Sequence, residues 1–97
     1  MELKPEFEFY AARMQEEIDK KFGRVAMLWT AEQTEIVLQM YSLYKQGTLG
    51  DTCIPRPWMI DVAAYQKWLA WSKLQGMSKE QAMRQYIVKA KELLESK

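Results

Sequence analysis

Apolar residues recur at helical spacing along most of this chain of 97 residues, and no stretch alternates convincingly as a strand does. Pro5 precedes a first amphipathic stretch and Gly23 follows it, as is typical of a helix start and a helix end. The apolar stripe between them consists of Phe7, Tyr10, Ala11, Met14 and Ile18. A wider stripe near the C-terminus consists of Ala82, Met83, Tyr86, Ile87, Ala90, Leu93 and Leu94. The pattern therefore predicts an all-α protein with four helices.

Capping residues mark where the later helices begin. Thr30 and Gln33 have the spacing of a capping box, so a second helix is expected to follow Thr30. Asp61 is a suitable N-cap for a third helix that ends before Gly76, and Ser78 with Gln81 forms a second capping box that starts the fourth.

The second helix is expected to extend to Gln46, because Gly47 stands where a glycine commonly ends a helix. Its predicted buried stripe consists of Ile36, Val37, Met40, Leu43 and Tyr44. Its predicted solvated side consists of Glu35, Gln39, Ser42 and Gln46.

Two connections stand out. The apolar bridge 24–29 is expected to pack against the body of the protein. The segment 47–61 contains two prolines and is long for a small helical domain, and such loops are typically functional or packed on the body.

Composition restricts the functional classes. The hydrophobic fraction of 48% and charged fraction of 28% are ordinary for one globular domain, here 1–97. A net charge of +1 provides no overall field for nucleic acid, so any anion site must be local.

The chain has no histidine and one cysteine, Cys53, which leaves no metal site, no internal disulfide and no common general base to propose. No apolar run approaches the roughly 18 residues that span a bilayer and the N-terminus is not a signal peptide, so a soluble cytoplasmic protein is expected.

A cluster of aromatic and basic residues is the best candidate for a site. Tyr41, Tyr44 and Lys45 share one side of the second helix, and two rings beside an ammonium group suit a ligand that is part flat ring and part anion. Lys67 lies on a face of the third helix that also carries Trp71. A snorkelling lysine is the ordinary interpretation of one such residue, but two favour a phosphate site. Tyr41, Tyr44 and Tyr86 would each also suit a tyrosine-rich core, and Trp68 and Trp71 are interpreted as core.

Several motifs in this region resemble the acyl-CoA-binding protein family. They are Y-S-L-Y-K-Q-G-T-L-G-D at 41–51, R-P at 56–57, K-W-L-A-W at 67–71, S-K-E-Q-A-M at 78–83 and Y-I at 86–87. The family's signature has these motifs in this order and with this spacing, without a gap. The resemblance implies an antiparallel four-helix bundle with a long connection between the second and third helices. The connection between the first and second helices is longer than is usual in the family.

The resemblance also implies roles for individual residues. Tyr41 would stack on or beside the adenine, and Lys45 and Lys67 would pair with the ribose 3′-phosphate. Tyr86 would contact the ribose and phosphates, and Tyr44 would line the same pocket. The acyl chain would lie in a groove bordered by the second and third helices, with Val37 and Leu38 at apolar positions. The family also places a basic residue on the first helix against the phosphates, and both Arg13 and Gln15 fall near that position.

The function implied is a non-enzymatic carrier that binds medium- to long-chain acyl-CoA esters one to one and keeps an intracellular pool of them. The ligand would be acyl-CoA, with no cofactor, no metal and no catalytic residue. The partners would be acyl-CoA-using enzymes rather than nucleic acid, and the protein would be a monomer without a transmembrane segment. The alternative is a helical interaction module, cut from a longer protein, whose tyrosines and lysines bind a protein or an RNA end. An enzymatic alternative, acyl-CoA hydrolysis, would need an activated nucleophile and base that the sequence does not offer.

Overall fold

The structure, a computed structural model, describes residues 2–58 and 60–95. Its helices are α1 (Leu3–Lys21), a 3-10 turn η1 (Ala26–Leu28), α2 (Ala31–Leu49), α3 (Val62–Ser72) and α4 (Lys79–Glu95). These described residues include no strand, so the predicted all-α fold with four α-helices is confirmed.

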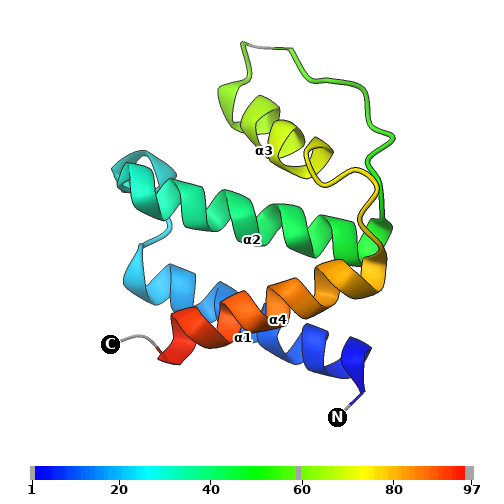
Figure 1. The fold of residues 1–97 in the computed structure, drawn as a ribbon. Helices are drawn as coiled ribbons and strands as arrows, with labels where there is room; N and C mark the ends of the chain where they lie inside the picture. Colours follow the sequence, from blue (N-terminus) through cyan, green and yellow to red (C-terminus); the bar gives the residue numbers. More distant parts are fainter. Residues whose placement is uncertain (1, 59, 96–97) are drawn as a thin grey trace.

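The four helices form a bundle in which α4 packs against both α1 and α2, while α3 packs against α2 on the side away from α1 and α4 (Figure 1). The backbones of α1 and α2 do not pack closely against each other, although both contact α4. The core lies between α1, α2 and α4 and consists of Phe7, Met14, Met40, Leu43, Ala82, Tyr86, Ile87 and Ala90. This arrangement leaves side chains of α1 and α2 facing each other above the core.

The predicted starts of α2, α3 and α4 are confirmed, whereas α1 begins at Leu3, before Pro5 rather than after it. The backbone N–H of Gln33 donates to Thr30 Oγ1 at 3.1 Å, and the Thr30 N–H donates to Gln33 Oε1 at 3.0 Å, which is a complete capping box. Asp61 Oδ1 accepts from the Ala64 N–H at 3.2 Å. Ser78 Oγ accepts from the Gln81 N–H at 3.0 Å, so three side chains satisfy amides at helix starts that the helices themselves leave free.

The predicted end of α2 at Gly47 is wrong. The helix continues to Leu49 and ends at Gly50, whose φ of 82° lies in the region that favours glycine. Gly47 lies inside the helix, and a Cβ atom there would be 3.2 Å from side-chain atoms of both Phe7 and Met83. Glycine is therefore needed at 47 for close packing and at 50 for backbone conformation.

The predicted solvated side of α2 is also wrong at two positions. Ser42 is 4% exposed and Gln46 is fully buried, because the chain returns over this side of α2. Gln46 Nε2 donates to Asp51 Oδ1 and to the Met77 carbonyl, each at 2.8 Å, and Asp51 Oδ1 also accepts from the Gly76 N–H at 2.8 Å. A polar side chain is therefore buried here because it ties the end of α2 to the turn between α3 and α4.

The long connection between α2 and α3 is held by two tryptophans of α3. Trp71 is 3% exposed, as predicted for a core residue, and its indole N–H donates to the Gly50 carbonyl at 2.9 Å. Trp68 is only half-buried rather than core, and its indole N–H donates to the Ile54 carbonyl at 2.8 Å. The connection is thus anchored at its first residues, while Trp58 and Ile60 are exposed.

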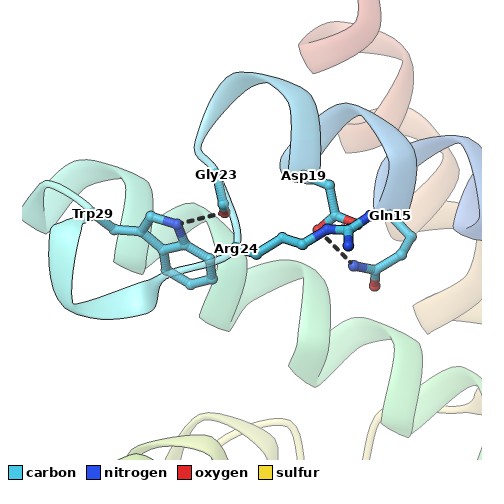
Figure 2. A network of polar contacts seen from close by, with 5 residues as sticks. All are labelled: Gln15, Asp19, Gly23, Arg24 and Trp29. Carbon is cyan, nitrogen blue, oxygen red and sulfur yellow. Dashed lines mark hydrogen bonds and ion pairs between the residues drawn. The ribbon is translucent and has the colours of Figure 1, made fainter.

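The bridge between α1 and α2 does not pack against the body as predicted. Met27 is 93% exposed and Leu28 is 79% exposed. Trp29 is turned inward instead, and its indole N–H donates to the Gly23 carbonyl at 2.9 Å (Figure 2).

Candidate ligand-binding groove

An open groove of about 590 Å³ lies between α1 and α2, above the core. Its volume is within the range of about 300–1,000 Å³ that is common for small-molecule sites. The lining residues are Glu8, Ala11, Ala12, Met14, Gln15 and Ile18 of α1, Val37, Leu38, Met40, Tyr41 and Tyr44 of α2, Lys67 of α3 and Tyr86 of α4. All four helices therefore contribute to one groove with largely apolar walls.

The structure brings the predicted site residues together. Val37, Leu38, Tyr41, Tyr44, Lys67 and Tyr86 all line the groove, although they come from three helices. Lys45 is not part of the lining, but its Nζ lies 5.7 Å from the centre of the Tyr41 ring. Helical spacing alone predicted that Lys45 lies beside Tyr41. Lys67 approaches the same ring because α3 packs on α2.

Two ammonium groups lie near the Tyr41 ring. Lys67 Nζ is 5.5 Å from the ring centre, and Lys45 Nζ is 5.7 Å from it and 5.8 Å from the centre of the Trp71 ring. Within the part of the chain that the structure describes, neither lysine forms an ion pair with a carboxylate. Two uncompensated cations beside a half-buried ring suit a ligand with both an anionic and an aromatic group.

A second aromatic cluster supports the other tyrosines of the groove. The Phe7 ring is stacked on Tyr44 at 5.6 Å between centres and meets Tyr86 edge-on at 5.2 Å. Phe7 is 1% exposed, so it holds both tyrosine rings in place from the core side of the groove. The sequence placed Phe7 in the apolar stripe of α1 but did not indicate that it supports the site.

The Tyr86 hydroxyl is a neutral group at the groove. Burial, and secondly the neighbouring Tyr44, raise the pKa of Tyr86 to about 12. Only 4% of the residue is exposed, although it contributes to the groove lining. At neutral pH this phenol keeps its proton and can donate a hydrogen bond to an anion or a hydroxyl group.

Apart from Gln15, which falls near the family's basic position, the α1 wall of the groove was not predicted. Glu8, Ala12 and Gln15 have i, i+4, i+7 spacing and lie along the border of the predicted α1 stripe, which is the signal that could have found them. Of the two residues near the expected basic position, Gln15 lines the groove. The Arg13 guanidinium lies 5.9 Å over the Phe9 ring instead.

A smaller hollow of about 390 Å³ lies between α2 and α3, beneath the long connection. Its lining includes Ile54, Pro57 and Trp68, and it shares Tyr41 and Lys67 with the larger groove. Val37 and Leu38, which the resemblance associated with the α2–α3 side, line the α1–α2 groove instead. Tyr41 and Lys67 thus stand at the boundary between the two spaces.

Comparison with known proteins shows the family of this chain. The family model described as "Acyl CoA binding protein" matches residues 4–90, which is most of the chain. The chain belongs to the acyl-CoA-binding protein family.

Individual members of the acyl-CoA-binding protein family support the same assignment. The chain is 39% identical over 83 residues to the acyl-CoA-binding protein of Gossypium hirsutum, and the match covers 86% of this chain and 93% of that relative. It is also similar to the crystal structure of Oryza sativa Acyl-CoA-Binding Protein 2, with a TM-score of 0.77 and 36% identity. That match covers 97% of this chain and 92% of the rice chain, so the likeness includes all four helices.

Residues 2–58 and 60–95 contain no cluster of three or more His, Cys, Asp or Glu side chains placed to hold a metal ion. None of the helices described is long and apolar enough to cross a membrane.

Proposed function

We propose that this chain binds medium- to long-chain acyl-CoA esters one to one in the α1–α2 groove and acts as a carrier that maintains a pool of them. The observation that carries the proposal is the pair of uncompensated lysines on the Tyr41 ring, at the side of a groove with apolar walls. Membership of the acyl-CoA-binding protein family supports the choice of ligand.

The head group of coenzyme A would occupy the polar part of the site. Adenine stacks on or beside Tyr41, a contact worth about 1–3 kcal/mol by analogy with base stacking on protein aromatics. Lys45 and Lys67 pair with the ribose 3′-phosphate, since their ammonium groups lie on the same ring. The protonated Tyr86 hydroxyl donates to the ribose or the phosphates, and Tyr44 lines the same pocket.

The acyl chain would occupy the apolar part of the groove. Val37 and Leu38 provide apolar wall on α2, and Ile18 faces the same space from α1. Each methylene buried there contributes about 0.8 kcal/mol, so affinity should rise steeply with chain length until the groove is filled. A protein of almost neutral overall charge can bind such a ligand, because only one end of the ligand is anionic.

A carrier role fits the side chains better than catalysis does. Hydrolysis of the thioester would need a nucleophile activated by a base, and the sequence has no histidine. Cys53 is exposed on the long connection and lies outside the linings of the groove and the α2–α3 hollow. The thioester would therefore be shielded rather than attacked, and delivered by a cytoplasmic monomer to enzymes that use acyl-CoA.

Isothermal titration calorimetry tests this function with coenzyme A and then with esters from octanoyl to stearoyl. We expect a stoichiometry of one and an affinity that rises steeply with chain length to a plateau that reports the reach of the groove. Equal and weak binding across the series would contradict an acyl site and leave only a head-group site. No binding of any ester would contradict the function as a whole and favour the interaction module.

A further inference from the structure

A second hollow adjoins the groove between α1 and α2 at the end of the bundle. It has a volume of about 240 Å³ and shares two wall residues, Met14 and Ile18, with the groove. The end of α1, the start of α2 and the end of α4 provide the rest of its lining, and Figure 1 shows these three segments at the same end of the bundle. We name this space the end hollow.

The end hollow lies farther along both helices of the groove, in the direction away from Tyr41 and its two lysines. On α2, the groove lining reaches Val37 and the end hollow continues to Glu32, which is nine residues or about 13.5 Å from Tyr41 along the helix. On α1, which runs in the opposite direction to α2, the groove lining reaches Ile18 and the end hollow continues to Phe22. A chain that follows the groove away from Tyr41 is therefore aimed at the end hollow.

Met14 and Ile18 form the partition between the two spaces. Met14 is 3% exposed, and Ile18 is half-buried and packs against the core. A methionine side chain is unbranched and flexible, so it can change rotamer to fit a ligand without a change of the backbone. The partition can therefore adapt to an alkyl chain that extends from the groove.

The interior of the end hollow is apolar. Phe22, Ile36, Leu93 and Leu94 line it and are partly buried, and the last three pack against the core. An apolar cavity of about 150 Å³ in another protein holds a benzene molecule. The larger end hollow thus has room for several carbons of an alkyl chain.

The charges of the end hollow do not suit the anionic part of acyl-CoA. Lys21 is the only cation in its lining among the residues that the structure describes, and its Nζ lies 3.6 Å from a carboxylate oxygen of Glu17. Glu32 adds a second carboxylate to the lining. The phosphates are therefore favoured beside Tyr41, where two lysines have no acidic partner in the described part of the chain, and the opposite end of the ligand points toward the end hollow.

We propose that the end hollow receives the terminal carbons of a long acyl chain, which pass Met14 and Ile18 from the groove. This inference rests on the proposed acyl-CoA site and extends it. Each methylene buried in an apolar site raises affinity about fourfold, which corresponds to about 0.8 kcal/mol. Affinity should therefore continue to rise for esters whose chains are too long for the groove alone.

A tryptophan on α4 tests the inference by filling the end hollow. In calorimetric titrations, Leu93→Trp should bind coenzyme A and its octanoyl ester as wild type does. It should bind the stearoyl ester about tenfold or more weakly, because two or more methylenes lose their apolar site. Val88→Trp is the matched control, since Val88 is exposed on α4 outside the groove and the end hollow, and it should bind the whole series as wild type does.

A second measurement uses the wild-type protein, so it does not depend on the folding of a variant. Stearoyl-CoA labelled with ¹³C at its terminal methyl group should show nuclear Overhauser contacts to the methyl groups of Leu93 and Leu94. Octanoyl-CoA labelled in the same way should show none, because its chain ends within the groove.

Two results would overturn the inference and leave the proposed function intact. One is the same dependence of affinity on chain length in folded Leu93→Trp and in wild type. The other is a bound stearoyl ester whose terminal methyl group makes no contact with Leu93 or Leu94. Failure of every ester to bind the wild type would instead overturn the proposed function, and the inference with it.

Discussion

The Lys67 ammonium lies 5.5 Å from the centre of the Tyr41 ring, so a cation from α3 meets an aromatic ring from α2 at the edge of the groove. Lys45 approaches the same ring to within 5.7 Å. Like charges repel, and the attraction of a cation to an aromatic ring near the protein surface is worth only about 0.5–1 kcal/mol. The pair is therefore better explained by an anionic ligand than by the stability of the free protein.

Replacement of Lys67 should separate binding from stability. Lys67→Ala should weaken binding of a long-chain acyl-CoA ester by about 1.5–3 kcal/mol, the usual contribution of a hydrogen bond to a charged group. Its melting temperature should change little, because Lys67 is exposed and forms no ion pair within the described part of the chain. Calorimetric titration and thermal unfolding on the same samples measure the two effects.

Lys73→Ala is the matched control for Lys67→Ala. Lys73 is an exposed lysine at the C-terminal end of α3 and lies outside the groove and the α2–α3 hollow. This variant should bind as wild type does. If Lys67→Ala unfolds the protein, or if both variants weaken binding equally, the assignment of Lys67 to the phosphate site is wrong.

Tyr86 should ionise only at high pH. Its folded-state pKa of about 12 lies above the ordinary value of 10.0, mainly because burial disfavours the phenolate. Since the raised pKa favours the protonated folded state, the stability it contributes is complete below pH 10 and is lost as pH rises toward 12. Ultraviolet titration should show a late phenolate component that disappears in Tyr86→Phe, and persistence of that component in the variant would refute the assignment. The variant should also bind acyl-CoA more weakly if the hydroxyl donates to the ligand.

Asp51 should have the opposite pH dependence. Hydrogen bonds from the Gly76 N–H and then from the Gln46 side chain lower its pKa below the ordinary value of 3.8. A lowered pKa favours the ionised folded state, so the contribution to stability is complete above pH 3.8 and is lost as pH falls through the folded-state pKa. Asp51→Asn should reduce stability at neutral pH and flatten the acid limb of the stability curve measured by urea unfolding. An unchanged acid limb would mean that this carboxylate does not link α2 to the turn before α4.

The sequence predicted the helices well because periodicity and caps are local signals. The Thr30–Gln33 capping box and the Asp61 cap depend on side chains only three residues apart. The end of α2 could not be predicted in this way, because whether Gly47 or Gly50 ends the helix depends on packing against Phe7 and Met83 from other helices. The same applies to Gln46, whose burial depends on partners that return from the far end of α3.

The candidate site was predicted in composition but not in shape. The motifs around Tyr41 and Lys67 were sufficient to group six residues of α2, α3 and α4 that line the groove. The α1 wall, with Glu8 and Gln15, depends on which border of a helix faces α2, and periodicity does not distinguish the two borders. The exposure of Met27 and Leu28 was not predicted either, because an apolar residue gives no sign in the sequence that it faces solvent.

Gly47→Ala tests the close packing of α2 against Phe7, the residue that supports two tyrosines of the groove. Alanine is favoured over glycine by about 1 kcal/mol within a helix, but overpacking a tight core costs about 1–3 kcal/mol. Phe7 is 1% exposed and is in contact with Tyr44 and Tyr86, so its ring cannot move away from the new methyl group. The free energy of unfolding in urea should therefore fall, by up to about 2 kcal/mol, despite the better helix former. In a Phe7→Leu background, where the ring is gone, the same substitution should cost clearly less, and equal cost in both backgrounds would show that Phe7 is not the obstacle.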